Sequence, residues 1–207
     1  MIIDMQKDFV LPEVLAANQR AYDIVPQVQQ LLTHARAESW PVFHIVREYR
    51  ADGSNIEHMR MEDFRARPRA VPGTDGCEII DELAPLPHEF RVVKWRFSAF
   101  MGTELDFLLR RLEVKHLVIA GTQLPNCVRA SVYDAMALDY DVTVVTDAVA
   151  ARTEAVHAAN LVDLVNLGVH CMTLEEFATT HAPTTSCSLP LLDPLPSIQE
   201  DGPHLEM

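Results

Sequence analysis

The chain has 207 residues, of which 48% are hydrophobic and 23% charged, and its formal net charge is −13. A chain of this size buries roughly 70% of its unfolded surface, so this composition predicts a large core and excludes global disorder. The negative charge repels a phosphate backbone and argues against nucleic acid as a partner, while no apolar run reaches the ~20 residues that cross a bilayer. Four widely spaced cysteines and the lack of a secretory signal pattern favour a soluble cytoplasmic protein with free thiols.

Short apolar runs alternate along the chain with longer helical patterns, which is typical of a parallel sheet covered by helices on both faces. Strands are predicted over residues 1–4, 41–47, 91–94, 116–121, 142–146 and 169–172. Helices are predicted over residues 21–38, 103–112, 126–138 and 153–167. Gly168 follows the last of these helices, where a left-handed cap favours glycine.

Two segments interrupt this alternation. Residues 49–77 form a polar insertion with Arg60, Arg65, Arg67 and Arg69, which is either a solvated loop or a lid that brings an arginine to an anionic substrate. Residues 183–207 hold five of the 13 prolines and no Lys or Arg, a composition that cannot pack a core of its own. We therefore expect one domain over residues 1–182 and a proline-rich acidic tail over residues 183–207.

Three residues with reactive or charged side chains stand at predicted strand ends. Asp4 closes the first strand, Lys94 closes the third, and Cys127 follows the fourth after a short turn. Ligands of open parallel sheets bind beyond the carboxyl ends of the strands, and a helix amino terminus at Cys127 would lower the pKa of its thiol. A nucleophile, a carboxylate and a cation suit acyl transfer. Taken singly, Asp4 could cap a turn, Lys94 could be solvated, and Cys127 could be a small core residue.

Three separated motifs resemble the isochorismatase-like cysteine hydrolase superfamily, and further matches continue to Phe177. The motifs are residues 3–9 (IDMQKDF), 94–100 (KWRFSAF) and 121–129 (GTQLPNCVR). The resemblance implies a Rossmann-like α/β fold, a three-layer α-β-α sandwich around a six-stranded parallel sheet, that assembles into homodimers or tetramers. The apolar side chains of residues 126–138 exceed what one sheet face needs, which also favours a homo-oligomer.

The same resemblance assigns roles to individual residues. Asp4 would be the general base, Lys94 its electrostatic partner and Cys127 the nucleophile. A cis peptide bond between Thr122 and Gln123 would direct the amide of Gln123, beside that of Cys127, at a substrate oxyanion.

Departures from the family pattern narrow the expected activity. Nicotinamidases bind a metal through an Asp-x-His motif, which occurs nowhere in this chain. His44 or His58 could be a metal ligand, but each stands alone in the sequence, and a lone histidine is more often an ordinary polar or packed residue. We therefore expect no metal, no cofactor and no recognition of pyridine carboxamides. Isochorismatases proper cleave a vinyl ether without a cysteine nucleophile, so Cys127 favours amide chemistry.

Arginines near the same sheet edge are candidates for substrate binding. Arg47 could hold a substrate carboxylate through its bidentate fork, with Phe9 as a second candidate contact, whereas Arg96 and Arg129 could form structural ion pairs.

These features favour a cysteine hydrolase that cleaves a carboxamide or ureido C–N bond of a small molecule through a thioester. The alternative is a catalytically silent protein that serves as an oligomeric binding or scaffold module. A dinucleotide-binding enzyme is excluded because no GxGxxG follows the first strand. A cysteine phosphatase is excluded because Tyr133 stands where its phosphate loop needs an arginine.

Overall fold

The computed structural model describes residues 1–14 and 20–180, so the expected tail and Cys187 lie outside the described residues. Its centre is a six-stranded parallel sheet with the strand order β3-β2-β1-β4-β5-β6. The strands are β1 (Ile2–Ile3), β2 (Phe43–Arg47), β3 (Phe90–Lys94), β4 (His116–Thr122), β5 (Asp141–Ala150) and β6 (His170–Met172). The predicted α/β fold class is confirmed, and each predicted strand overlaps an observed one.

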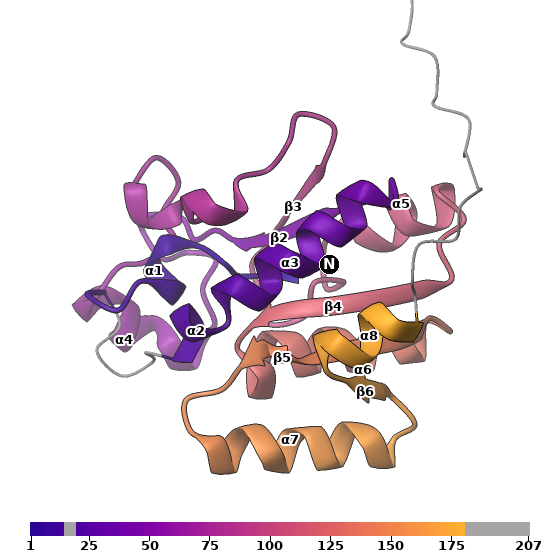
Figure 1. The fold of residues 1–207 in the computed structure, drawn as a ribbon. Coiled ribbons are helices and arrows are strands. Elements are labelled where there is room, and N and C mark those ends of the chain that lie inside the picture. Colours follow the sequence, from indigo (N-terminus) through magenta and orange to yellow (C-terminus); the bar gives the residue numbers. More distant parts are fainter. Residues whose placement is uncertain (15–19, 181–207) are drawn as a thin grey trace, which may run out of the picture.

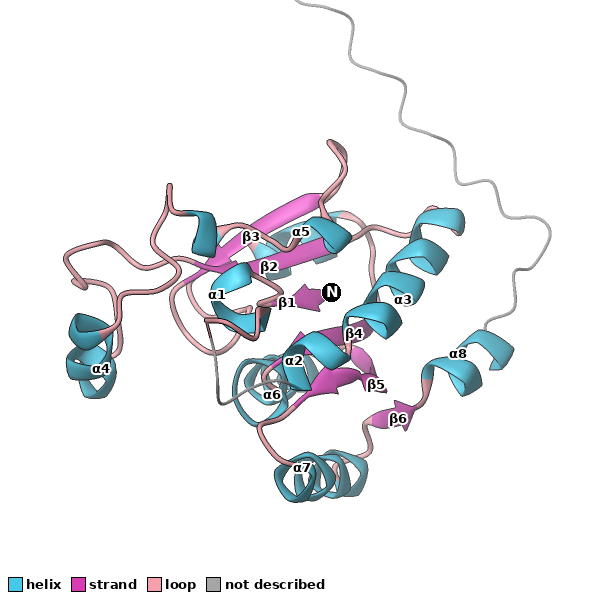
Figure 2. Ribbon diagram, turned by 60° about the vertical axis from the view of Figure 1, so that its left-hand side comes forward, coloured by secondary structure: helices cyan, strands magenta, loops and turns pink. Residues whose placement is uncertain are grey.

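Helices cover both faces of this sheet (Figures 1 and 2). They are α1 (Lys7–Val10), α2 (Arg20–Asp23), α3 (Val25–Ala37), α4 (Met61–Ala66), α5 (Leu105–Arg111), α6 (Arg129–Ala137), α7 (Glu154–Asn166) and α8 (Leu174–Thr180). One buried apolar cluster joins the sheet to α5, α6 and α7, and a second joins the opposite face to α1, α2, α3 and α8. No helix among the described residues is long and apolar enough to span a membrane.

The predicted helix over residues 21–38 is divided into α2 and α3 at Ile24. Pro26 lies in the first turn of α3, where its missing amide is tolerated because no intrahelical partner exists there. The helix predicted over residues 153–167 is α7, and the side chain of Thr153 caps it by accepting a hydrogen bond from the Val156 amide. Gly168 follows with φ of 89°.

The insertion over residues 49–77 is more ordered than a solvated loop. It contains α4, and it has a small core of its own in which Tyr49, Ile56, Phe64 and Ala70 are buried. Phe64 packs edge-on against Tyr49, with 5.6 Å between the ring centroids. The solvated-loop interpretation is therefore wrong, because these apolar residues are too widely spaced in sequence to give a periodic pattern but meet in space.

The apolar face expected on residues 126–138 is used within the chain itself. Val128, Val132 and Ala135 are buried in the core against the sheet, and Tyr133 and Met136 are partly buried beside them. This segment therefore offers little apolar surface to a second copy. Larger exposed apolar side chains lie elsewhere, on α7 (Val162 and Val165) and around α5 (Met101 and Phe107).

Candidate active site

A cavity of about 270 Å³ lies at the carboxyl edge of the sheet, and it contains the strongest candidate site. Asp4 after β1 and Cys127 after β4 both line it, together with Phe9 and Gln123. Lys94 at the end of β3 is 1% exposed and does not itself line the cavity, but its Nζ contacts the Asp4 carboxylate. The topology therefore brings together the three residues that the sequence suggested for catalysis.

Asp4 reaches this cavity because β1 is short and the chain turns sharply after it. Asp4 has a positive φ of 52°, a conformation that is uncommon for residues other than glycine and is concentrated at functional sites. Next to it, Gly121 on β4 has φ of 116°, and a Cβ atom there would lie 2.2 Å from the carbonyl oxygen of Ile3. Glycine at this position therefore permits the close approach of β4 to β1.

Lys94 and Asp4 form a buried ion pair. Lys94 Nζ lies 2.8 Å from Asp4 Oδ2 and 3.3 Å from the carbonyl oxygen of Arg96. The other carboxylate oxygen, Asp4 Oδ1, is buried and accepts no hydrogen bond from the described residues. A buried acceptor without a partner is costly and calls for an explanation, and here it is available to receive a proton.

Cys127 lies in a π-helical turn (Leu124–Val128) that leads into α6, and it is 7% exposed. Its carbonyl oxygen accepts a hydrogen bond from Ser131 Oγ at 2.7 Å, and Arg47 Nη2 lies 3.3 Å from its sulfur. Burial raises the pKa of the Cys127 thiol and the charge of Asp4 raises it further, whereas Lys94 and Arg47 lower it.

The expectation that a helix amino terminus lowers the pKa of this thiol is therefore wrong. α6 begins two residues after Cys127, and desolvation of the thiolate outweighs the cations beside it. The Cys127 thiol and the Asp4 carboxylate line the same cavity, and among the described residues Asp4 Oδ1 has no hydrogen-bond partner.

Arg47 lines the cavity, but its guanidinium nitrogens are hydrogen-bonded to other groups of the protein. Its Nη1 donates to the hydroxyl of Tyr49 and to Glu57 Oε1 at 3.2 Å, and its Nη2 donates to the carbonyl oxygen of Arg96 at 2.9 Å. Its Nε lies 3.9 Å from Asp4 Oδ2. Burial lowers the pKa of Arg47, but the negative groups around it outweigh burial and the net shift is upward, so the guanidinium is a fixed positive charge beside the thiol.

The Thr122–Gln123 peptide bond is cis, at the position where the motif resemblance places one. Thr122 ends β4 and is 1% exposed, and Gln123 is half-buried at the cavity wall. Within the described residues, the backbone N–H of Gln123 donates no hydrogen bond. An unpaired amide beside a nucleophile is suited to stabilise an oxyanion.

The residues near this site do not fit the metal centre of nicotinamidases. Arg47, a cation, ends β2, and His44 in the same strand is 1% exposed with Nε2 hydrogen-bonded to Glu89 at 2.8 Å. His58 is exposed on the insertion. Across residues 1–14 and 20–180, no three His, Cys, Asp or Glu side chains form a group that could hold a metal ion.

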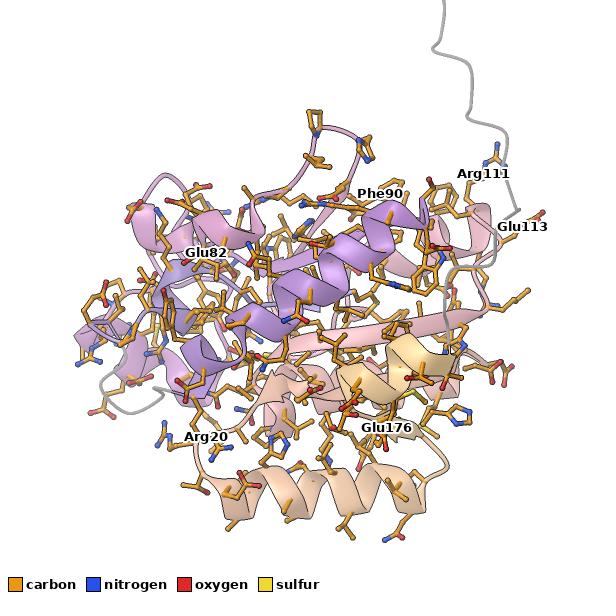
Figure 3. All side chains as sticks on the ribbon, viewed as in Figure 1. Arg20, Glu82, Phe90, Arg111, Glu113 and Glu176 are labelled. Carbon is orange, nitrogen blue, oxygen red and sulfur yellow. The ribbon has the colours of Figure 1, made fainter. Side chains whose placement is uncertain are left out.

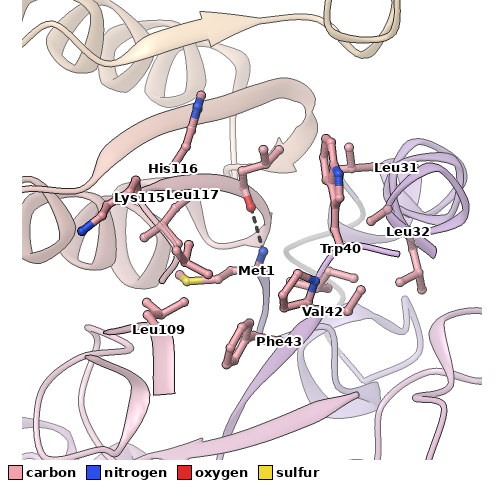
Figure 4. Close-up of a pocket in the computed structure, with 15 residues that line it drawn as sticks. Met1, Leu31, Leu32, Trp40, Val42, Phe43, Leu109, Lys115, His116 and Leu117 are labelled. Atoms are coloured by element: carbon pink, nitrogen blue, oxygen red, sulfur yellow. Dashed lines mark hydrogen bonds between the residues drawn. The ribbon is translucent and has the colours of Figure 1, made fainter. Parts of the chain in front are cut away.

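A second cavity, of about 310 Å³, lies at the opposite edge of the sheet, where β2 and β4 begin (Figure 4). Its walls are mainly apolar, and Met1 donates a hydrogen bond from its amino nitrogen to the carbonyl oxygen of Val118 at 2.7 Å. Lys115 and His116 are its only titratable side chains within the described residues. It is slightly larger than the first cavity, but it brings no nucleophile and acceptor together, so the first cavity is the better candidate.

Arg60 and Arg69, two of the insertion arginines that the sequence suggested for an anionic substrate, line the first cavity. Arg152, which lines it just after the end of β5, was missed as a site residue. The predicted fifth strand stopped at residue 146, whereas β5 continues to Ala150, so a longer strand would have placed Arg152 at the carboxyl edge. Arg129, in contrast, bonds to Tyr133 and to α7 and does not line the cavity.

Comparisons with known proteins found relatives over most of the chain. The isochorismatase domain model matches residues 1–176. An Arabidopsis thaliana protein named probable inactive nicotinamidase is 40% identical over 182 residues, which cover 86% of this chain and 93% of that protein.

Two solved structures are similar over most of the chain. An isochorismatase family protein from Desulfovibrio vulgaris is 49% identical with a TM-score of 0.83, over 88% of this chain and 96% of that one. An N-carbamoylsarcosine amidase from Thermoplasma acidophilum is 26% identical with a TM-score of 0.71, over 84% of this chain and 94% of that one.

Proposed function

Because the chain belongs to the isochorismatase family, whose members include amidohydrolases, we propose that it is a cysteine hydrolase acting on a C–N bond of a small carboxamide or ureido compound. The observation that carries the proposal is the convergence of Asp4, Lys94 and Cys127 at one small cavity. A nucleophile, a proton acceptor and a fixed cation within one site are the components of covalent acyl transfer.

The reaction begins with transfer of the Cys127 thiol proton to Asp4, whose Oδ1 accepts no hydrogen bond in the part of the chain that the structure describes. The thiolate attacks the amide carbonyl carbon, and the backbone amides of Gln123 and Cys127 stabilise the oxyanion. When the C–N bond breaks, the leaving nitrogen takes the proton from Asp4 and departs as ammonia or an amine. Water then gives a proton to Asp4 and attacks the thioester, which releases the carboxylic acid and restores the thiol.

The two buried cations have separate tasks in this proposal. Lys94 holds the Asp4 carboxylate in place through the 2.8 Å contact between its Nζ and Asp4 Oδ2. Arg47, 3.3 Å from the sulfur, stabilises the thiolate as the proton leaves. Because the Arg47 guanidinium already donates hydrogen bonds to Tyr49, Glu57 and the Arg96 carbonyl oxygen, we assign it to stabilising the thiolate and not to binding a substrate carboxylate.

The second candidate function is a catalytically silent member of the family that acts as an oligomeric binding or scaffold module. The name of the Arabidopsis relative, probable inactive nicotinamidase, favours it. That name refers to one substrate class, however, and lack of nicotinamidase activity is also what we expect of a chain without the Asp-x-His motif.

Hydrolysis of a panel of carboxamides and ureido acids by the purified chain, followed by ammonia release, separates the two candidates. We expect turnover of at least one compound, together with an acyl adduct on Cys127 in the intact mass of rapidly quenched enzyme. Absence of both turnover and adduct across the panel would favour the silent module.

A further inference from the structure

Tyr49 is the first residue of the insertion, and its hydroxyl lies next to the guanidinium that contacts the candidate nucleophile. The side chain of Tyr49 is 0% exposed. Its backbone N–H donates to the carbonyl oxygen of Ala70 at 2.8 Å, and its ring packs edge-on against Phe64. Both contacts belong to the insertion, so the small core of the insertion fixes where the Tyr49 hydroxyl lies.

Three charged side chains meet at the Tyr49 hydroxyl. Arg47 Nη1 donates a hydrogen bond to it, and Arg60 Nη1 donates a second at 3.0 Å. The hydroxyl itself donates to Glu57 Oε2 at 3.1 Å. These contacts satisfy the hydroxyl both as a donor and as an acceptor. Burial raises the pKa of Tyr49, so at neutral pH the hydroxyl keeps its proton and the side chain carries no charge.

The hydroxyl is one of the groups that determine how far the Arg47 guanidinium lies from Cys127. Nη1 of Arg47 also donates to Glu57 Oε1 at 3.2 Å. Nη2 donates to the carbonyl oxygen of Arg96 at 2.9 Å and lies 3.3 Å from the Cys127 sulfur. Without the hydroxyl, Nη1 would keep only Glu57 among its described partners, and that carboxylate would lose one of its own donors. The guanidinium would then be drawn toward Glu57 and away from the sulfur.

We propose that Tyr49 is a positioning residue of the candidate site, whose hydroxyl holds the Arg47 guanidinium at the distance from Cys127 that stabilises the thiolate; this rests on the proposed function of the same site. Arg47 lowers the pKa of the Cys127 thiol, so displacement of the guanidinium should make the thiol less acidic. The insertion therefore acts on the nucleophile through one hydroxyl, besides supplying part of the cavity wall.

The substitution Tyr49→Phe removes this hydroxyl without changing any charge. Phenylalanine keeps the ring that packs against Phe64. The other charged groups that line the cavity or contact Asp4 stay in the chain, and they are Asp4, Lys94, Arg60, Asp63, Arg69 and Arg152. The matched control is Tyr140→Phe, because Tyr140 is also buried, its hydroxyl donates to Asp106 at 2.8 Å, and it does not line the cavity.

The first test is the pH profile of Cys127 alkylation by iodoacetamide, followed by peptide mass spectrometry. In Tyr49→Phe we expect the profile to move to higher pH and the rate at neutral pH to fall roughly 3- to 10-fold, the range that corresponds to loss of one hydrogen bond. Tyr140→Phe should match the wild type. An unchanged profile in Tyr49→Phe, a move to lower pH, or an equal change in both variants would overturn the proposal.

The second test asks whether the effect passes through Arg47. In an Arg47→Gln background, Tyr49→Phe should cause no further change in alkylation, because the guanidinium that the hydroxyl holds is absent. A further loss as large as in the wild-type background refutes the positioning role. If circular dichroism shows that Arg47→Gln does not fold, a crystal structure of Tyr49→Phe decides. A distance between Arg47 Nη2 and Cys127 Sγ longer than 3.3 Å supports the role, and an unchanged distance refutes it.

These tests need no turnover and so separate the positioning role from the proposed function. If every amide resists hydrolysis while the alkylation profile moves as expected, the positioning role stands and the hydrolase proposal fails. With an amide that is hydrolysed, Tyr49→Phe should lower kcat and leave KM unchanged, because the hydroxyl acts on the thiolate and not on the bound substrate. A raised KM with unchanged kcat would count against the role.

Discussion

Lys94 Nζ lies 2.8 Å from Asp4 Oδ2, although the two residues are 90 positions apart and β2 separates their strands in the sheet. Both side chains are almost fully buried, so the contact forms only when β1, β2 and β3 are in register. The ion pair of the candidate site therefore depends on the central strand order of the fold.

Replacement of either reacting residue should abolish hydrolysis and leave the fold intact. We expect Cys127→Ala and Asp4→Asn each to lower kcat/KM by at least about 1,000-fold, with the double variant no worse than the worse single variant, because the two residues act as a unit. Asparagine keeps an acceptor for Lys94 and tolerates the positive φ of Asp4. Circular dichroism and the midpoint of thermal unfolding serve as the folding controls. Near-wild-type turnover in either variant would contradict the proposed mechanism.

Asp4→Asn should also make Cys127 more acidic, even as it stops turnover. The negative charge of Asp4 raises the pKa of the thiol, so its removal should lower that pKa. The pH profile of Cys127 alkylation, followed by peptide mass spectrometry, measures this change. The matched control is Asp139→Asn, which removes the same charge from an exposed residue with φ of 62°. An unchanged profile in Asp4→Asn would show that the carboxylate does not act on the thiol.

Glu89 should stabilise the fold at neutral pH and lose this effect in acid. Burial raises the pKa of Glu89, but hydrogen bonds from Arg36, the Leu86 amide and His44 outweigh it and lower the pKa to about 2. Because the folded-state pKa is depressed, the stabilisation is complete above the unfolded value of about 4.5 and disappears as the pH falls toward 2.

We therefore expect Glu89→Gln to lower the free energy of unfolding by roughly 3 kcal/mol at pH 7, and by progressively less below pH 4. Urea titrations of both chains across this range measure the difference. Glu113→Gln, at an exposed position beyond α5, controls for the general change in net charge (Figure 3). A difference between wild type and Glu89→Gln that stays constant with pH would refute the assignment.

Exhaustive chelation should leave the hydrolytic activity unchanged. The reason is the chemistry of the residues at β2: the cation Arg47 lines the cavity at the end of this strand, and His44 of the same strand is bonded to Glu89. Activity after dialysis against EDTA and 1,10-phenanthroline checks this expectation. Loss of activity that zinc or iron restores would count against it.

The chain should form a homodimer or homotetramer in solution, as the family resemblance implies. Exposed apolar side chains on α7, including Val162 at 61% and Val165 at 54%, are candidates for the contact. Sedimentation velocity at micromolar concentration measures the state, and Val162→Asp with Val165→Asp tests the face. A wild-type monomer would rule out the assembly, and an unchanged oligomer in the variant would rule out this face.

The regular part of the fold could be predicted from the sequence because buried strands and amphipathic helices leave periodic apolar patterns. The end of β5 and the helix α4 could not. β5 continues through Thr146 and Asp147, which interrupt its apolar run, and α4 is held by contacts with Tyr49 that lie outside any local window.

The candidate site also has features that could be predicted from the sequence and features that could not. Asp4, Lys94 and Cys127 could be placed because parallel strands end at one edge of the sheet. The contacts that the Arg47 guanidinium makes could not be predicted, since its partners Arg96 and Cys127 lie 49 and 80 positions away in the sequence. The direction of the Cys127 pKa depends on burial, which the position of a helix start does not reveal.

The burial of Cys127 has a consequence for survival of the protein under oxidative stress. Peroxide attacks the thiolate form of exposed cysteines and converts it successively to sulfenic, sulfinic and sulfonic acids. Cys127 is 7% exposed with a raised pKa, and the free thiols of Cys77 and Cys171 have raised pKa values as well. We therefore expect peroxide to oxidise Cys127 more slowly than an exposed cysteine whose pKa is low.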